Sequence, residues 1–430
     1  MNSRGYHVRA SMAQAWRFQG WRMVAAGGGI QFLQAGLLHQ AFGAYLALLT
    51  SQFGWSKTAL SGAATLQPLE AAALGPMMGW FIDRFGPQGM IRIGICVLGS
   101  GFMLLSQIES LMGFYLSFLV IALGSSLCGF FPINVAIIHW FERLRARALS
   151  ALSLGLAFGG ISVPLVAWTM QTWGWRTTAF CSGLAFILIG WPLAKNFRRR
   201  PADLGQTVDG LPVSSDQSAD ISTQSPGFTV KQALRTSAFW LLSLGHGSAL
   251  FVVTAVNVHA IAHMKEGLGY SVAQASLVIT LMTLFQIVGV SIGWWCGDRF
   301  EKRKIAAICM IMHAIGLLML AWSRAAWMLV AFAVLHGSAW GLRGPFMQAL
   351  RADYFGRKAI GMILGLSGII IMVGQIGGPL VAGAFADLSG HYRTGFTVIA
   401  ALAVLGSVFF WLARKPAKPE PLLANQNEAD

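Results

Sequence analysis

The sequence predicts an all-α membrane protein whose twelve transmembrane helices form two pseudo-symmetric six-helix bundles. Three observations lead to this prediction. Hydrophobic residues make up 55% of the 430 residues, charged residues make up only 11%, and the mean hydropathy is +0.61, a balance that water-soluble domains do not show. Apolar stretches of about 20 residues, long enough to cross a bilayer, recur along the chain. The two halves of the chain are also similar in sequence.

Twelve apolar stretches, separated by short charged or glycine-rich turns, have the length of transmembrane helices. In chain order they cover residues 22–49, 60–81, 91–105, 111–138, 149–169, 177–193, 239–263, 275–296, 305–322, 327–350, 360–385 and 395–411. The apolar pattern stops between the sixth and seventh stretches, where Arg, Ser, Gln and Asp are frequent. We therefore expect an N-terminal bundle at 1–194, a cytoplasmic linker at 195–235, a C-terminal bundle at 236–414 and a cytoplasmic tail at 415–430.

The basic residues follow the membrane topology and do not gather on one nucleic-acid-binding domain, although the net charge is +15. With the N terminus inside, outer loops carry only Lys57, Arg176, Lys265, Arg324 and Arg393, one cationic residue lies within a helix, and the others lie on the cytoplasmic side. This asymmetry obeys the positive-inside rule. It predicts a multi-pass protein of a bacterial inner membrane with both termini in the cytoplasm. The first helix should be retained, because no cleavage site precedes it.

The sequence indicates neither a cofactor nor an enzyme. It contains no P-loop for ATP hydrolysis, no GxSxG or HExxH motif and no clustered catalytic carboxylates. The cysteines lie in apolar helices without the spacing of metal ligands, so we expect no zinc site and no disulfide framework. They are Cys96, Cys128, Cys181, Cys296 and Cys309.

The two halves align at an offset of roughly 215 residues, the long period expected of duplicated transporter halves. GGISVPLVA at residues 159–167 matches GQIGGPLVA at 374–382 and sets Pro164 in register with Pro379. The tripeptide Asp-Arg-Phe occurs at 83–85 and again at 298–300, each time directly after an apolar stretch. The matches follow the chain order, so we infer an internal duplication.

At these positions the chain resembles the major facilitator superfamily over nearly its full length. GWFIDRFG at 79–86 resembles the family's signature turn between helices two and three, and GWWCGDRF at 293–300 is a weaker copy. An Asp and an Arg at a helix end can pair with each other or with a neighbouring helix end. We therefore predict a conformational latch, with a plain solvated turn as the alternative. Its residues are Asp83, Arg84, Asp298 and Arg299.

Finer features resemble the monocarboxylate and oxalate/formate branch of that superfamily. They include FGWSKTAL at 53–60, HWFERLRARALS at 139–150, PADLGQTVDG at 201–210 and DYFGRKAIGMILG at 353–365. This resemblance implies a carrier of small organic acids that works with protons or by exchange. Members of the branch hold the anion with basic residues in helix eight or eleven. Because residues 275–293 and 360–385 contain no Lys or Arg, the resemblance does not identify the substrate.

Glu70 and Arg343 are the charged side chains that the predicted spans make functional candidates, because a charge in hydrocarbon costs several kcal/mol. Glu70 lies about 15 Å along its helix, near the midplane, where burial favours a protonated carboxyl. We predict that Glu70 couples transport to protons; a structural carboxylate bonded to a hydroxyl or a His is the alternative. Arg343 carries a planar guanidinium suited to a carboxylate. We predict that Arg343 binds the anion or serves a gate; snorkelling to the inner interface is the alternative.

Uncharged polar residues and histidines complete the set of candidate substrate-binding residues. By resemblance, helices one, four, seven and ten line the cavity of such carriers, and the candidates lie on these helices. Any of them could instead pack inside the bundle or bond helix to helix. The candidates are Gln34, His39, Asn134, Asn257, His259 and His336.

The sequence therefore predicts alternating-access transport of a small organic anion, a mono- or dicarboxylate, by proton symport or anion exchange. Its partners would be this substrate, protons or a counter-anion, and the lipid bilayer, with no nucleic acid. Export of an amphipathic drug or siderophore is the alternative within transport. A membrane sensor or scaffold that no longer transports is the alternative outside it.

Overall fold

The computed structural model describes residues 18–39, 41–55, 57–159, 162–210 and 227–417, and these residues form helices and no strand. The N-terminal half contains α2 (Gln19–Gln34), the π-helical turn η1 (Ala35–His39), α3 (Phe42–Phe53), α4 (Lys57–Phe85), α5 (Pro87–Leu105), α6 (Leu111–Cys128), α7 (Phe130–Trp140), α8 (Arg145–Gly159), α9 (Val163–Trp173) and α10 (Trp175–Ala194). The C-terminal half contains α12 (Ser237–Ala262), the π-helical turn η6 (His263–Gly267), α13 (Val272–Cys296), α14 (Lys302–Ala321), α15 (Ala326–Phe355), α16 (Ile360–Ser389) and α17 (Arg393–Leu412).

The described residues of each predicted apolar stretch are mainly helical, and the predicted fold class is confirmed. Three stretches of the N-terminal half are each divided into two helices, as α2 with α3, α6 with α7 and α8 with α9. Gly129 interrupts the second of these with a non-helical backbone, three residues before Pro132. Eight helical segments of the described chain are long and apolar enough to cross a membrane on their own. The predicted domain limits remain predictions.

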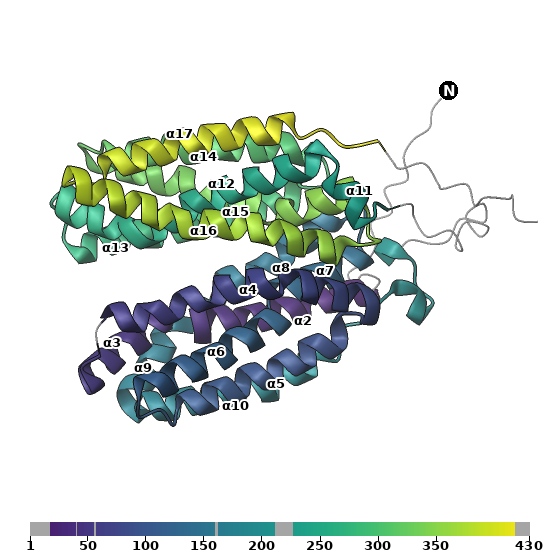
Figure 1. Ribbon diagram of the computed structural model, residues 1–430, viewed down its shortest axis with the longest axis horizontal. Coiled ribbons are helices and arrows are strands. Elements are labelled where there is room, and N and C mark those ends of the chain that lie inside the picture. Colours follow the sequence, from purple (N-terminus) through teal and green to yellow (C-terminus); the bar gives the residue numbers. More distant parts are fainter. Residues whose placement is uncertain (1–17, 40, 56, 160–161, 211–226, 418–430) are drawn as a thin grey trace, which may run out of the picture.

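The helices of each half form one bundle, and the bundles lie side by side with the linker at one end (Figure 1). We call this end the linker end and the opposite end the open end. Between the bundles, α4 packs against α16 and α8 packs against α13. Glycines permit the first contact, because a Cβ added at Gly79 would lie only 2.3 Å from the carbonyl oxygen of Gly361.

The first part of the linker is folded onto the N-terminal bundle. It contains the 3₁₀ turns η3 (Pro201–Leu204) and η4 (Val208–Gly210), and the short helix α11 (Val230–Leu234) precedes α12. The carboxylate of Asp209 accepts hydrogen bonds from the backbone N–H groups of Glu142, Arg143 and Leu144, at 2.8–3.2 Å. These bonds fix the linker to the turn between α7 and α8.

Candidate substrate cavity and linker-end contacts

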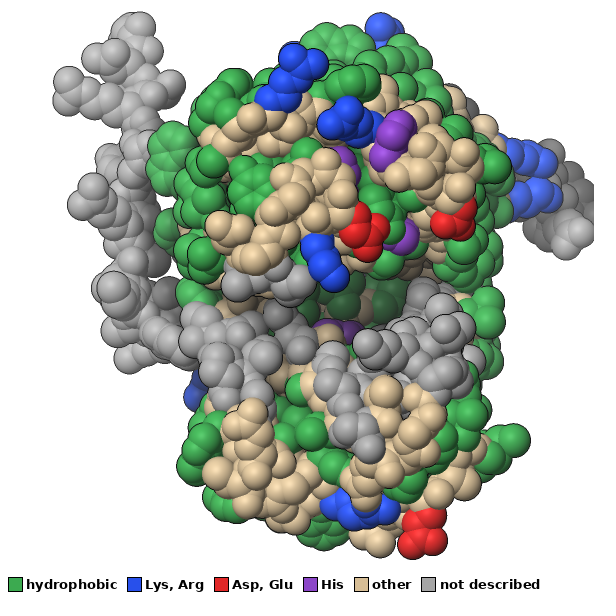
Figure 2. All heavy atoms as spheres, turned by 90° about the vertical axis from the view of Figure 1, so that its left-hand side faces the viewer, with side chains coloured by type: hydrophobic (Ala, Val, Ile, Leu, Met, Phe, Trp, Pro, Cys, Tyr) green, Lys and Arg blue, Asp and Glu red, His purple; other side chains and the backbone are tan. Residues whose placement is uncertain are grey.

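A cavity of about 500 Å³ lies where the two bundles meet, between helices α2, α4, α6, α7 and α8 of one half and α16 of the other. The space-filling view onto the open end shows a hollow between the two halves (Figure 2). The cavity wall is mixed, since it includes the apolar side chains of Met78, Phe130, Phe131 and Met372. Its polar side chains are those of Gln31, Gln34, His39, Ser125, Ser126 and Gln375.

Two glutamines of α2 bring amide groups to this wall. The amide of Gln34 donates from Nε2 to the sulfur of Cys128 at 3.2 Å. Gln31, one turn earlier on α2, is only 1% exposed, and both polar atoms of its amide lack a hydrogen-bond partner among the described residues. An unpaired buried amide costs free energy, so Gln31 is the polar group of the wall with most to gain from a ligand. The sequence predicted Gln34 and missed Gln31, although both lie one turn apart on the same helix.

Glu70 lies directly behind the cavity wall. Its Oε2 accepts a hydrogen bond of 2.6 Å from the hydroxyl of Ser126, which lines the cavity. Its Oε1 is buried and has no partner among the described residues. The hydroxyl of Ser126 therefore lies between the carboxyl group of Glu70 and the cavity. This geometry is compatible with both roles that the sequence left open, and proton coupling stays a prediction.

The other predicted substrate-binding residues lie in the cavity wall, in the bundle interiors or, for Asn257, at an exposed position. His39 lines the cavity, as does Gln34. Asn134 is buried and donates to the carbonyl oxygen of Phe130. His259 lies 3.0 Å from the carbonyl oxygen of Pro379, and Asn257 is exposed on α12. His336 is buried, with its Nδ1 atom 3.1 Å from Nδ1 of His313. Substrate binding by these residues stays a prediction.

Arg343 is only 1% exposed and does not belong to the cavity wall. A second arginine of the same helix is buried as well. Helix α15 continues beyond residue 350, and Arg351 is also 1% exposed. The guanidinium of Arg351 donates to the carbonyl oxygens of Met347 and Leu242. Sequence reasoning ended the helix at this arginine because a charged residue usually marks the membrane boundary.

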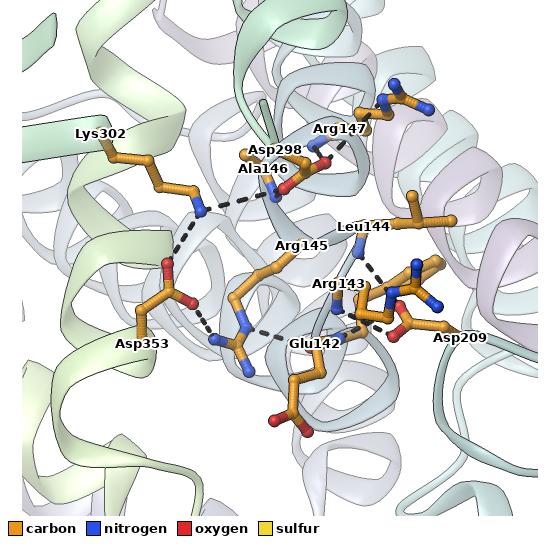
Figure 3. Close-up of polar contacts among 11 residues, drawn as sticks. Glu142, Arg143, Leu144, Arg145, Ala146, Arg147, Asp209, Asp298, Lys302 and Asp353 are labelled. Atoms are coloured by element: carbon orange, nitrogen blue, oxygen red, sulfur yellow. Dashed lines mark hydrogen bonds and ion pairs between the residues drawn. The ribbon is translucent and has the colours of Figure 1, made fainter. Parts of the chain in front are cut away.

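Two aspartates of the predicted latch cap helices of the opposite bundle at the linker end. Asp83 on α4 accepts from the backbone N–H groups of Gly361 and Met362, both at 3.1 Å, at the start of α16. Asp298 accepts from Ala146 at 3.0 Å and Arg147 at 3.1 Å, at the start of α8 (Figure 3). A carboxylate at a helix N terminus satisfies unpaired N–H groups and interacts favourably with the helix dipole. Burial raises the pKa of Asp298, and the bonds from Arg147 and Ala146 oppose this shift.

The latch arginines contact aromatic rings of their own helix ends. The guanidinium carbon of Arg84 lies 5.4 Å from the ring centre of Trp80, and that of Arg299 lies 4.9 Å from the ring centre of Trp295. None of the ion pairs between described residues joins either arginine to a latch aspartate. Of the four residues of the predicted latch, only the two aspartates contact the opposite bundle in the described interactions. A latch function for the four residues stays a prediction.

Ion pairs between the bundles add to the aspartate caps. Asp353 at the end of α15 pairs with Arg145 of α8, and its other oxygen lies 2.9 Å from the ammonium of Lys302 (Figure 3). Arg357 lies 3.4 Å from the carboxylate of Glu142. Arg145 is 3% exposed, so its pair with Asp353 is shielded from water on one side. Contacts between the halves therefore close the linker end, whereas the opposite end is hollow.

Comparison with known proteins agrees with this architecture. A sequence model described as Major Facilitator Superfamily matches residues 28–259 and 242–429. Monocarboxylate transporter 13 of Bos taurus is 23% identical, over 94% of this chain and 93% of that protein. The hexuronate transporter of Escherichia coli K12 is 23% identical, over 86% of this chain and 88% of that protein.

Solved structures of transporters have the same fold as this chain. The proton:xylose symporter XylE superposes with a TM-score of 0.71 at 14% identity, over 93% of this chain and 97% of that one. The human organic anion transporter MFSD10 superposes with a TM-score of 0.68 at 13% identity, over 94% and 100%. Two helical bundles around a cavity that is closed at one end define a multi-pass membrane transporter. The chain belongs to the Major Facilitator Superfamily.

Proposed function

We propose that the chain is a secondary transporter of a small organic acid, a mono- or dicarboxylate, and works by alternating access. The observation that carries this proposal is the cavity between the bundles. At the linker end the cavity is closed by hydrogen bonds and ion pairs between the bundles, and these contacts could break while each bundle stays intact. Rocking of one bundle against the other would open that end. The similarity to proteins named monocarboxylate and hexuronate transporters supports an organic acid as the substrate.

The proposed substrate site consists of His39 and the amides of Gln31, Gln34 and Gln375. The described cavity wall contains no Lys or Arg, so neutral hydrogen-bond donors and one imidazole would hold the carboxylate. Glu70 would take up the proton through its contact with Ser126. The positive-inside asymmetry supports a cytoplasmic linker end and cytoplasmic termini. The hollow end would then face away from the cytoplasm, in an outward-facing conformation.

The test is uptake and counterflow in proteoliposomes with a panel of mono- and dicarboxylates, and with xylose as a neutral comparison. Gln31→Leu and His39→Phe should each raise the KM of the transported acid roughly tenfold, the effect of losing a hydrogen bond to a charged group. His391→Phe, at an exposed turn near the open end, is the matched control and should leave KM unchanged. Failure of every carboxylate to exchange, or unchanged KM in both cavity variants, would contradict the proposal.

The aromatic and methionine side chains of the cavity wall support one alternative, the export of an amphipathic drug or siderophore. Such a substrate would contact Phe130, Phe131 and Met372. Export would appear as drug resistance in cells that overexpress the protein, without carboxylate counterflow in liposomes. A sensor or scaffold would show neither activity.

A further inference from the structure

Five basic side chains lie together inside the C-terminal bundle, away from the cavity wall. Arg343, Arg351 and His336 belong to α15, His246 to α12 and His313 to α14. The two arginines are 1% exposed, His313 and His336 are 0% exposed, and His246 is 9% exposed. We call this set the basic core. It extends over several turns of α15, from Arg351 near the linker end toward the middle of the helix.

The arginines of the basic core have no acidic partner among the described residues. The guanidinium Nε and Nη1 of Arg343 and the Nε of Arg351 are buried and have no hydrogen-bond partner in the part of the chain that the structure describes. None of the ion pairs of the described chain includes either residue. The nearby acids are engaged at the linker end, where Asp298 caps α8 and Asp353 pairs with Arg145. A guanidinium stays charged in a protein, so no acid of the described chain compensates the charge of the basic core.

The contacts within the basic core leave further donors unused. Nη1 of Arg351 lies 3.4 Å from Nδ1 of His246, and His246 interacts electrostatically with both arginines. Nδ1 of His313 lies 3.1 Å from Nδ1 of His336, and the Nε2 atoms of both rings lack a partner. One Nδ1 must donate and the other accept, so the accepting ring, when neutral, carries its proton on Nε2. That N–H group is a buried donor without an acceptor among the described residues.

Unpaired buried cations are costly, and removal of one partner from a buried ion pair typically destabilises a protein by several kcal/mol. A compact anion between Arg343 and Arg351 would compensate both guanidinium groups and accept hydrogen bonds from their unpaired N–H groups. We propose that the C-terminal bundle binds a small monovalent anion in the basic core, between Arg343, Arg351 and His246. The ligand is a halide ion or a single carboxylate group. This binding is separate from the substrate cavity and does not depend on the proposed transport function.

The test measures the thermal unfolding midpoint of the purified full chain in detergent, at constant ionic strength, as sodium gluconate is replaced by sodium bromide or by sodium acetate. Gluconate is the reference anion because it is too large for a closed core. Saturating bromide or acetate should raise the midpoint of the wild type by about 5 °C. A response to bromide alone identifies a halide site. A response to acetate supports a carboxylate site in the basic core only if Arg343→Gln abolishes it, because the proposed substrate cavity could also bind acetate.

Arg343→Gln and Arg351→Gln should each abolish this shift. Arg92→Gln is the matched control, because Arg92 lies in the N-terminal bundle over the ring of Trp191, and it should keep the full shift. A wild type that responds to neither anion, or an Arg343→Gln variant that responds as the wild type does, overturns the proposal. If the variants do not fold, the anomalous signal of bromide in crystals of the wild type shows whether bromide occupies the basic core. A peak beside Arg343 supports the site, and its absence at saturating bromide excludes a halide.

Discussion

Glu70 is the candidate residue with the clearest test. Its Oε2 accepts a hydrogen bond from Ser126 of the cavity wall, and its Oε1 has no partner among the described residues. Glu70→Gln removes the proton but keeps the shape of the side chain. We expect the variant to lose gradient-driven uptake at least roughly tenfold while substrate exchange stays close to the wild-type rate, since exchange need not cycle a proton. Both rates are measured in proteoliposomes with and without a pH gradient.

The control for Glu70 is Glu266→Gln, which removes an exposed carboxylate of η6 and should leave both rates unchanged. Wild-type rates for Glu70→Gln in both assays would remove Glu70 from the mechanism. An equal loss in both assays would indicate a structural carboxylate that holds Ser126.

Arg343 can be tested for substrate recognition independently of the anion proposal. Arg343→Lys keeps the charge and loses the planar fork. Its surroundings are closed, at 1% exposure, so the substituted side chain could not escape to the interface as a snorkelling residue would. If Arg343 also contacts the substrate during transport, Arg343→Lys and Arg343→Gln will each weaken substrate affinity roughly tenfold, measured by binding to protein shown to be folded. Unchanged affinity and rate in both variants would exclude Arg343 from substrate recognition and would leave the anion proposal untouched.

At the scale of elements, the contact of α4 with α16 depends on side chains being absent. A Cβ added at Gly79 would lie 2.3 Å from the carbonyl oxygen of Gly361, and backbone cannot yield as a flexible side chain can. Gly79→Val should therefore push the bundles apart, lower the thermal midpoint by a few degrees and reduce transport roughly tenfold or more. Gly89→Val is the control, because a Cβ at Gly89 meets nothing within 4 Å. Similar behaviour of the two variants would refute the close-packing argument.

The aspartate caps, Asp83 at the start of α16 and Asp298 at the start of α8, are a second set of contacts between helices of the two bundles. The double variant Asp83→Asn, Asp298→Asn removes both charges from the starts of α16 and α8, at a cost of about 1 kcal/mol for each cap. We expect the linker end to open more often. A single cysteine introduced at Ser150, which is fully buried close to Gly293 of α13, should then react several times faster with a thiol reagent added from the linker side.

The comparison for the caps is Asp387→Asn, which changes an exposed acid near the end of α16 and should leave the labelling rate of that cysteine as it was. An unchanged rate in the double variant would show that the caps do not control opening. The ion pairs of Asp353 with Arg145 and Lys302 would then be the next contacts to remove.

For the whole molecule, the charge asymmetry predicts the orientation in the membrane, which can be measured directly. In a background without native cysteines, Ala202→Cys lies in the folded part of the linker, and His391→Cys lies at an exposed turn near the open end. We expect an impermeant thiol reagent to label His391→Cys in intact cells and Ala202→Cys only after permeabilisation. Labelling of Ala202→Cys in intact cells would reverse the predicted topology.

The sequence by itself determined the helices, the division into two halves and the superfamily. These properties are local, because span length and hydropathy are read from neighbouring residues and the duplicated Asp-Arg-Phe turns lie in plain register. The aspartates of those turns were also predicted to meet a helix end. The sequence could not tell that Arg84 and Arg299 would instead lie over tryptophan rings.

Only the tertiary structure decided which polar side chains share a site. Lipid and protein interior are equally apolar, so the hydrophobic pattern of a spanning helix does not fix its rotation about its own axis. Gln31 was therefore missed while Gln34 was predicted, and both line the cavity. The basic core could not be predicted for a similar reason. The sequence does not tell whether a guanidinium near a helix end reaches water or donates to backbone carbonyl oxygens inside the bundle. Packing of α12, α14 and α15 made that choice for Arg351.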